Sequence, residues 1–294
     1  MRDFIESALK GQKADYIEIR IEETETTNIS FRGRQLDQIN HSTGKGGNVR
    51  VCVKGGWGFA SFNDLYSIDS KIEQAVNQAR MVGNGKTELA DILPVIDIVP
   101  PHIVSNPANI PLAEKHRILE GYLDLLWGGP EIQTSTLRYS DGHRRLFYGN
   151  NQGTYTEQSR IDVNFNASAV ARSGGDLQQS SISMGSLGNF DLIHQLQNEV
   201  AELPQKAVDF LAAPQVTGGE YTVILDPILA GVFVHEAFGH LSEADHVYEN
   251  PNLREIMVLG RRFGGKHLNI VDGAKIPGLR GSFRYDEEGM EAQR

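Results

Sequence analysis

Two histidines and one glutamate in the run His235-Glu236-Ala-Phe-Gly-His240 are the residues best suited to chemistry. Neutral imidazole nitrogens are common ligands of zinc, and a carboxylate beside them can activate a water molecule at the ion. Four of the nine histidines of the chain fall between residues 235 and 267. The run is therefore a candidate metal site, with His235 and His240 as ligands and Glu236 as the base.

The spacing of the two histidines decides whether they can share an ion. In an ideal α-helix, residues four apart lie about 40° apart around the axis, whereas residues five apart lie roughly 140° apart. A π-bulge adds one residue to a turn and would bring His235 and His240 back together, and Gly239 could permit it or a helix end. In a regular helix the metal site fails. The simplest interpretation is then two hydrogen-bonded histidines and a solvated Glu236.

Other candidate residues carry weaker signals. Glu243 and Asp245 could act as further ligands or as carboxylates that orient a ligand. Cys52 alternates with valines in a predicted strand, which favours a buried or edge thiol over a nucleophile. The glycine runs 44–47 and 55–58 lack the register of a phosphate-binding loop and predict hairpin turns.

Composition and charge narrow the class of protein. The chain has 294 residues, enough for one large domain or two smaller ones, and its single cysteine excludes an internal disulfide framework. A formal net charge of −10 argues against nonspecific nucleic-acid binding, because phosphates need a surface rich in Lys and Arg. No apolar run resembles a signal peptide or a membrane span, so we expect a soluble cytoplasmic protein.

The first 111 residues predict an α+β segment over 1–83 and a connector over 84–111. Isoleucines at 17, 19 and 21 alternate with charged residues, the period-two pattern of a half-buried strand. The acidic run 22–25 indicates an exposed strand end. The connector holds five of the eleven prolines. The other predicted elements are a short N-terminal helix, strands over 28–32, 48–54 and 57–62, and a helix from Asp69 to Gly83.

The remaining sequence predicts a second α+β segment over 112–215 and a third that carries the histidines. The second segment has predicted helices over 112–127 and 191–213, the latter broken or kinked at Pro204, and strands over 132–140, 144–148, 153–171 and 180–185. A strand over 221–225 then precedes Asp226-Pro227, the cap and first position of a helix that continues to about Ser242. The predicted fold class is α+β, with antiparallel or mixed sheets and flanking helices.

The run from Val234 to His246 resembles the metal-binding segment of the TldD/PmbA family of metalloproteases. The order around it is also similar, with the strand 221–225 and Asp226-Pro227 before it and Tyr285-Asp-Glu-Glu-Gly289 after it. Looser similarity extends over essentially the whole chain. The match is closest to the TldD-like branch, because the TldE/PmbA-like partner branch lacks the histidine motif.

The resemblance implies a zinc-dependent metallopeptidase that cleaves peptides or unfolded segments in the cytoplasm. His235 and His240 would then be zinc ligands, and Glu236 would be the catalytic general base. Family members work as dimers, so the implied partner is a second copy or a TldE/PmbA-like subunit, and neither nucleic acid nor a membrane is expected. Edge strands would pair with an extended substrate.

One ligand of the family's site has no counterpart in this chain. The resemblance implies a cysteine in a C-terminal β-rich region as third ligand, and Cys52 does not match that position. We therefore expect 216–294 to be the truncated start of the metal-binding C-terminal domain, with zinc weak or absent unless Glu243, Asp245 or His246 completes the site. The alternative function is a non-catalytic peptide-binding or regulatory subunit of a TldD/TldE-type complex, in which a regular helix holds the histidines apart.

Overall fold

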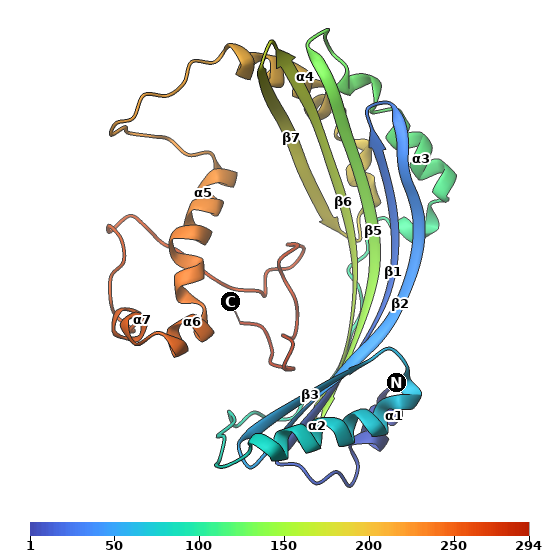
Figure 1. Cartoon of the computed structure of the whole chain (residues 1–294), viewed down its shortest axis with the longest axis vertical. Helices are drawn as coiled ribbons and strands as arrows, with labels where there is room; N and C mark the ends of the chain where they lie inside the picture. The colour runs from blue at the N-terminus through green and yellow to red at the C-terminus, as the bar shows by residue number, and fades with distance from the viewer. Residues whose placement is uncertain (294) are drawn as a thin grey trace. The chain divides into compact units, whose positions relative to one another are not determined.

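The computed structural model describes residues 1–293, and the chain divides into two compact units (Figure 1). The first, the sheet unit, consists of residues 1–213 together with 275–292. The second consists of residues 214–274 together with Gln293. Arg294, the last residue of the expected segment 216–294, lies outside the described residues. The boundaries of the four expected segments stay a prediction.

The sheet unit is built on one seven-stranded mixed sheet. Its strands follow the order β3-β2-β1-β5-β6-β4, and β7 also pairs with β6. All neighbouring strands are antiparallel except β4, which runs parallel to β6. The expected α+β class with a mixed sheet and flanking helices is confirmed. The strands are β1 (Tyr16–Arg32), β2 (Gln35–Val53), β3 (Gly56–Phe62), β4 (Ile96–Val99), β5 (Ile132–Asn150), β6 (Tyr155–Ser173) and β7 (Asp176–Leu187).

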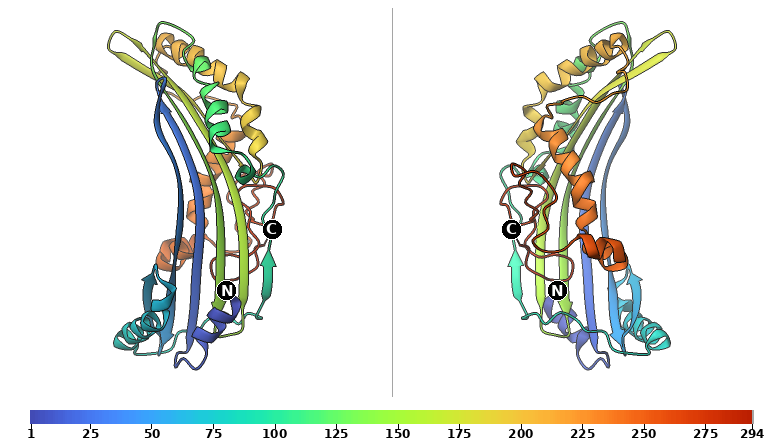
Figure 2. Two further views of the ribbon diagram at one scale, coloured as in Figure 1. Left: turned by 90° about the vertical axis from the view of Figure 1, so that its right-hand side faces the viewer. Right: turned by 90° about the vertical axis from the view of Figure 1, so that its left-hand side faces the viewer.

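Helices cover one face of this sheet in two places. Ile19 and Ile21 of β1 belong to one buried apolar cluster, and Ile29 and Phe31 belong to the other. These residues occupy alternate positions of one strand, so both clusters lie on the same face. The left view of Figure 2 looks onto this face. The helices that pack there are α1 (Arg2–Leu9) and α2 (Ile68–Val82) in one cluster, and α3 (Leu112–Glu120) and α4 (Gln197–Ala212) in the other.

Charged side chains in the middle of the sheet separate the two apolar clusters. Glu23 forms ion pairs with Lys45 of β2 at 2.8 Å and with Arg145 of β5 at 3.1 Å. The acidic run 22–25 thus lies in the middle of β1, with a partner strand on each side. The strand end expected there is wrong, because basic residues on the neighbouring strands balance the acidic charge within the sheet.

The two glycine runs have different structures. Lys54 and Gly55 both have positive φ, 49° and 77°, and form the tight turn between β2 and β3 that the second run predicts. The run 44–47 lies within β2 and pairs with β1. A Cβ on Gly47 would lie 2.6 Å from the ring of Phe62, so glycine is needed there for close packing. The hairpin turn expected at 44–47 is therefore wrong.

Two further expectations for regular structure are wrong, namely a break of the helix at Pro204 and a strand over 221–225. α4 continues through Pro204, which is buried beside Gly128, and its neighbour Leu203 belongs to an apolar cluster. Packing there outweighs the local cost of a proline inside a helix. Residues 221–225 form no strand, because no strand within 1–293 pairs with them, and Ile224 is fully exposed.

Residues 275–292, the anchor segment, pack against the sheet face opposite the helices. Gln158 of β6 binds the main chain of Tyr285 twice. Its side-chain oxygen accepts from the N–H at 3.0 Å, and its amide donates to the carbonyl at 3.1 Å. Glu288 forms an ion pair with Arg50 of β2 at 2.6 Å. Residues 214–274 are therefore linked to the sheet unit at both ends, through α4 and through the anchor segment.

Candidate metal centre

The helix α5 (Pro227–Val234), which leads to the histidines, begins where the sequence predicts it. The side chain of Asp226 accepts hydrogen bonds from the main-chain N–H groups of Ile228 at 2.8 Å and Leu229 at 3.0 Å. These bonds satisfy two donors that a helix start leaves free. Pro227 occupies the first helical position, where no N–H is needed. The cap fixes the start of α5 and thereby the helical register at which His235 follows.

A π turn, η5 (His235–Gly239), follows directly on α5. The main-chain N–H of His240 donates to the carbonyl of His235, so this turn holds one residue more than an α-helical turn. This is the distortion that the five-residue spacing requires for convergence. Gly239 has ordinary helical dihedrals, φ −54° and ψ −58°, and a Cβ there would meet nothing closer than 3.7 Å. The turn therefore does not depend on the conformational freedom of glycine.

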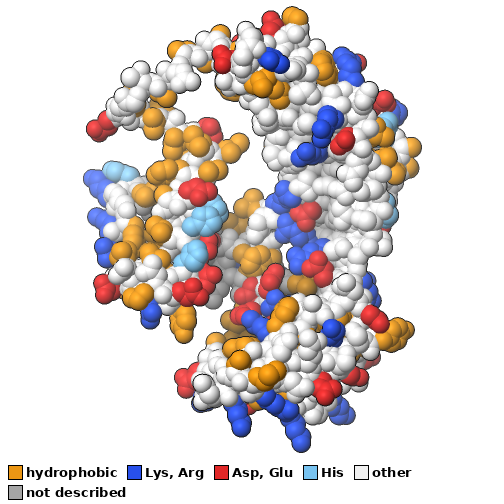
Figure 3. Space-filling view, in the orientation of Figure 1, with side chains coloured by type: hydrophobic (Ala, Val, Ile, Leu, Met, Phe, Trp, Pro, Cys, Tyr) orange, Lys and Arg blue, Asp and Glu red, His pale blue; other side chains and the backbone are white. Residues whose placement is uncertain are grey.

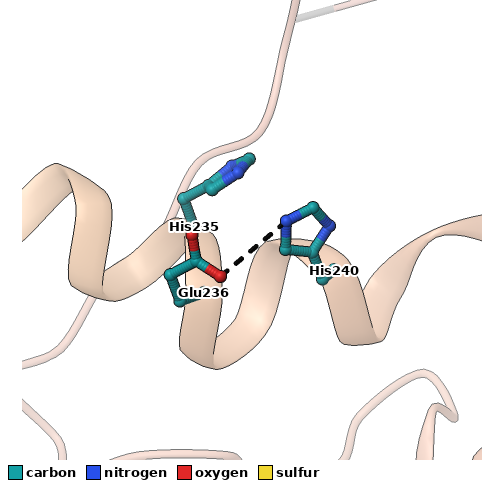
Figure 4. A group of neighbouring side chains, drawn as sticks. All are labelled: His235, Glu236 and His240. Atoms are coloured by element: carbon teal, nitrogen blue, oxygen red, sulfur yellow. Dashed lines mark ion pairs between the residues drawn. The ribbon is translucent and has the colours of Figure 1, made fainter.

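The π turn brings three potential ligand side chains together, as Figure 4 shows. The ring centroids of His235 and His240 are 4.4 Å apart, with the ring planes at 63°. Oε2 of Glu236 lies 3.9 Å from Nε2 of His240. One ligand atom of each residue lies within 4.8 Å of the other two, and all three residues are exposed. Two imidazole nitrogens and a carboxylate oxygen can thus approach one ion that keeps water ligands as well.

A single 3-10 turn and an extended residue follow directly after the π turn. In the single 3-10 turn η6 (His240–Ser242), the hydroxyl of Ser242 donates to the carbonyl of Gly239 at 2.9 Å. This bond satisfies an acceptor that the helix end leaves free. Glu243 then adopts an extended conformation, with ψ 129°. Its Oε1 lies 2.6 Å from Nδ1 of His240. The short helices α6 (Ala244–Glu249) and α7 (Pro251–Ile256) follow.

A second group of potential ligands consists of Glu243, Asp245 and His246, whose ligand atoms also lie within 4.8 Å of one another. Asp245 and His246 belong to this group and not to the one around the π turn. The carbonyl of His240 accepts a hydrogen bond from Nδ1 of His246 at 3.2 Å. That carbonyl, together with the carboxylates of Asp245 and Glu243, raises the pKa of His246.

Residues 214–274 surround the site without forming a core. None of their side chains is buried, and apolar side chains of α5 such as Phe233 are exposed. Figure 3 shows histidine and acidic side chains at the surface over this part of the chain. Across residues 1–293, no helix is both long and apolar enough to cross a membrane. Both histidines of the motif, His235 and His240, are exposed to solvent.

A buried polar network, which the sequence pattern does not predict, lies beneath the anchor segment. The alternation over 17–21 predicts Glu18 on the polar side of its strand, but only 1% of Glu18 is exposed. Its carboxylate accepts from the hydroxyl of Tyr16 at 2.6 Å and pairs with Arg50 at 2.9 Å. Burial and this carboxylate raise the pKa of Tyr16. The sequence does contain a signal for this network. Tyr16, Glu18 and Arg20 alternate along the strand, so they lie on one face and can bond to one another instead of to water.

Three family models match successive parts of the chain. The PmbA/TldA metallopeptidase domain 1 matches residues 17–79, the central domain matches 105–213, and the C-terminal domain matches 218–294. Together these ranges cover most of the sequence. The chain belongs to the PmbA/TldD metallopeptidase family, and the resemblance inferred from the HEAFGH run is confirmed.

Similar individual proteins are consistent with this family assignment. The chain is 43% identical over 282 residues to a metalloprotease of Synechocystis, covering 95% of this chain and 61% of that protein. It is 25% identical over 288 residues to a zinc metalloprotease TldD homolog of Saccharolobus solfataricus, again covering 95% and 61%. The chain thus spans about three-fifths of the length of these curated relatives. The solved structure of a candidate modulator of DNA gyrase from Bacteroides thetaiotaomicron has the same fold. The two structures superpose with a TM-score of 0.69 at 17% sequence identity, and the match covers 82% of this chain and 56% of that one.

Proposed function

We propose that the chain carries the metal-binding part of a zinc-dependent peptidase, which cleaves peptides or unfolded segments in the cytoplasm. The observation that carries the proposal is the π turn, where His235, Glu236 and His240 come within reach of one ion. A regular helix, as in the alternative of a non-catalytic subunit, would leave the two imidazoles roughly 140° apart. The relatives named metalloprotease and zinc metalloprotease support the same class of enzyme.

The donor atoms at the π turn suit zinc. Catalytic zinc sites combine three protein ligands, drawn from imidazole, thiolate and carboxylate, with one position open to water or substrate. His235 and His240 would each hold the ion through one ring nitrogen. When bound, zinc supplies Lewis acidity that polarises a peptide carbonyl and makes water more acidic. The resemblance assigns the third ligand to a cysteine, and Cys52, buried in β2, does not match it. We therefore expect this chain alone to bind zinc weakly.

Glu236 is the residue that would move protons in this proposal. Its carboxylate is exposed and lies 3.9 Å from Nε2 of His240, so it borders the space that a water molecule and a peptide would share. The carboxylate would take one proton from the attacking water and pass it to the nitrogen of the leaving amine. Its charge is then the same before and after each turnover, and no other base is needed.

An extended, unfolded substrate fits the edges of the sheet. Residues 35–46 of β2 pair with β1 on one side, whereas β3 covers only 47–53 on the other. Main-chain groups along an open edge bind an extended peptide with little dependence on its side chains. For the partner we propose a second copy or a TldE/PmbA-like subunit. The family resemblance and the exposed apolar side chains of α5 support such a dimer.

Glu236→Gln tests the proposed function. In the protein expressed from its complete reading frame, we expect this substitution to lower hydrolysis of an unfolded protein roughly 10²- to 10⁴-fold at unchanged zinc content. Glu255→Gln changes another exposed glutamate, on α7, and is the matched control, which should keep wild-type turnover. Normal turnover of Glu236→Gln at equal zinc content would contradict the proposal.

A further inference from the structure

We infer that Glu243 is a positioning residue, which holds His240 in the tautomer that a metal ligand requires. The inference rests on the proposed function, because it assigns Nε2 of His240 to the ion. Glu243 itself would touch neither the ion nor the substrate. Its task is to accept the hydrogen on Nδ1, so that the lone pair of the neutral imidazole remains on Nε2.

The contacts of His240 place different carboxylates at its two nitrogens. Oε1 of Glu243 lies 2.6 Å from Nδ1, within hydrogen-bond distance. Oε2 of Glu236 lies 3.9 Å from Nε2, on the side of the proposed ion. The two nitrogens of an imidazole point away from each other, so a hydrogen bond at one of them fixes which group the other can bind.

The exposure of His240 explains why such a partner is useful. Its side chain is 48% exposed, so packing does little to hold the orientation of the ring. Water alone bonds to either nitrogen and does not select the Nδ1–H tautomer. A carboxylate on Nδ1 selects that tautomer, fixes the ring and increases the basicity of Nε2. Metal-binding histidines commonly have a partner of this kind.

Two other roles for Glu243 fit the geometry less well. Its second oxygen, Oε2, lies 3.6 Å from Nδ1 of His246, so both carboxylate oxygens face Nδ1 atoms and not the Nε2 side of His240. Glu243 also precedes α6 at its N-cap position, but its side chain makes no capping hydrogen bond. Replacing Glu243 by alanine therefore removes the bond to His240 without removing a helix cap.

Tautomer populations test the inference without any metal. Long-range ¹⁵N–¹H correlation spectra at about pH 8.5, where an ordinary imidazole is neutral, report which nitrogen of each histidine carries the hydrogen. We expect Nδ1–H to predominate at His240 in the wild type and Nε2–H to predominate in Glu243→Ala. Glu255→Ala removes an exposed glutamate from the same unit and should keep the wild-type population. A predominant Nε2–H form in the wild type, or an unchanged population in Glu243→Ala, would overturn the inference.

Zinc affinity, measured by competition with a chromogenic chelator, gives a second readout. We expect Glu243→Ala to bind zinc 10- to 100-fold more weakly, which is the usual effect of losing such a partner, and Glu255→Ala to match the wild type. Equal affinities of Glu243→Ala and the wild type would count against the positioning role. A wild-type chain that binds zinc at neither His235 nor His240 would instead count against the proposed function, and the tautomer populations still decide the role of Glu243.

Discussion

The sheet unit and residues 214–274 obtain their structure from different interactions. The sheet unit buries two apolar clusters against one face of a seven-stranded sheet, and such burial is the main source of stability in folded proteins. Residues 214–274 bury no side chain, yet they bring His235, Glu236 and His240 together. Main-chain hydrogen bonds of α5 and of the π turn set that geometry. In this chain, stability and the proposed chemistry therefore reside in different parts.

Matched substitutions of one phenylalanine in each region should give the largest difference in the free energy of unfolding. Phe165 of β6 is fully buried, with its ring 5.2 Å from that of Tyr122, whereas Phe233 of α5 is 60% exposed. We expect Phe165→Ala to lower the free energy of unfolding by about 3–5 kcal/mol and Phe233→Ala to change it by less than about 0.5 kcal/mol. Urea denaturation followed by circular dichroism measures both. Equal losses would mean that α5 is packed as tightly as the sheet.

Alanine substitutions of two glycines, Gly58 in the sheet unit and Gly239 in the π turn, should give the next largest difference in the free energy of unfolding. A Cβ on Gly58 of β3 would overlap the main-chain carbonyl oxygen of Ala75 in α2, which neither element can avoid without moving. We expect Gly58→Ala to destabilise the sheet unit by about 3 kcal/mol. Gly239→Ala meets only ordinary contacts and gains helix propensity, so the π turn should tolerate it with a change below about 1 kcal/mol. The same denaturation experiment applies, and a larger loss for Gly239→Ala would show that the π turn needs glycine.

Asp162 of β6 links the sheet to the anchor segment through Arg280. Its contribution to the stability of the anchor segment should be smaller and should depend on pH. Burial opposes its charge, but hydrogen bonds and ion pairs with Arg160 and Arg280 hold its pKa below the ordinary value of 3.8. Because the folded-state pKa is lowered, the stabilising contribution is complete above the ordinary pKa and is lost as the pH falls through the folded-state value. The anchor segment should therefore loosen below about pH 4 and not between about pH 5 and 7.

Hydrogen exchange of residues 275–292 measures this effect. At neutral pH, we expect Asp162→Asn to lower protection there roughly threefold, because partly exposed ion pairs contribute less than about 1 kcal/mol. Protection in the variant should also depend less on pH than in the wild type. Unchanged protection in Asp162→Asn would show that other contacts of the anchor segment, such as those of Tyr285 with Gln158, hold it without help from the ion pairs.

Features set by neighbouring residues could be predicted from the sequence. The alternating isoleucines predicted β1, and Asp226-Pro227 predicted the start of α5, because each depends on a few adjacent positions. The five-residue spacing of the histidines identified the π turn as the geometry that a shared ion requires, although the spacing alone could not choose it over a regular helix.

Features set by residues distant in the sequence could not be predicted in this way. Glu18 is buried because Arg50 and Tyr148, on two other strands, bond to its carboxylate. β4 lies within the proline-rich connector and exists because β6 offers it a parallel edge. The bond between Glu243 and His240 spans only three residues, but it depends on the extended conformation of Glu243 after η6, which no local sequence pattern specifies.

The most direct test of the metal centre is a zinc titration of the ¹⁵N-labelled chain, with the ring nitrogens of all nine histidines observed. We expect the ring nitrogens of His235 and His240 to shift together, with one zinc ion per chain, and His235→Ala or His240→Ala to abolish the response of the remaining partner. A response confined to other histidines, or a wild-type response of His240 in the His235→Ala variant, would contradict the claim that the π turn makes the two imidazoles ligands of one ion.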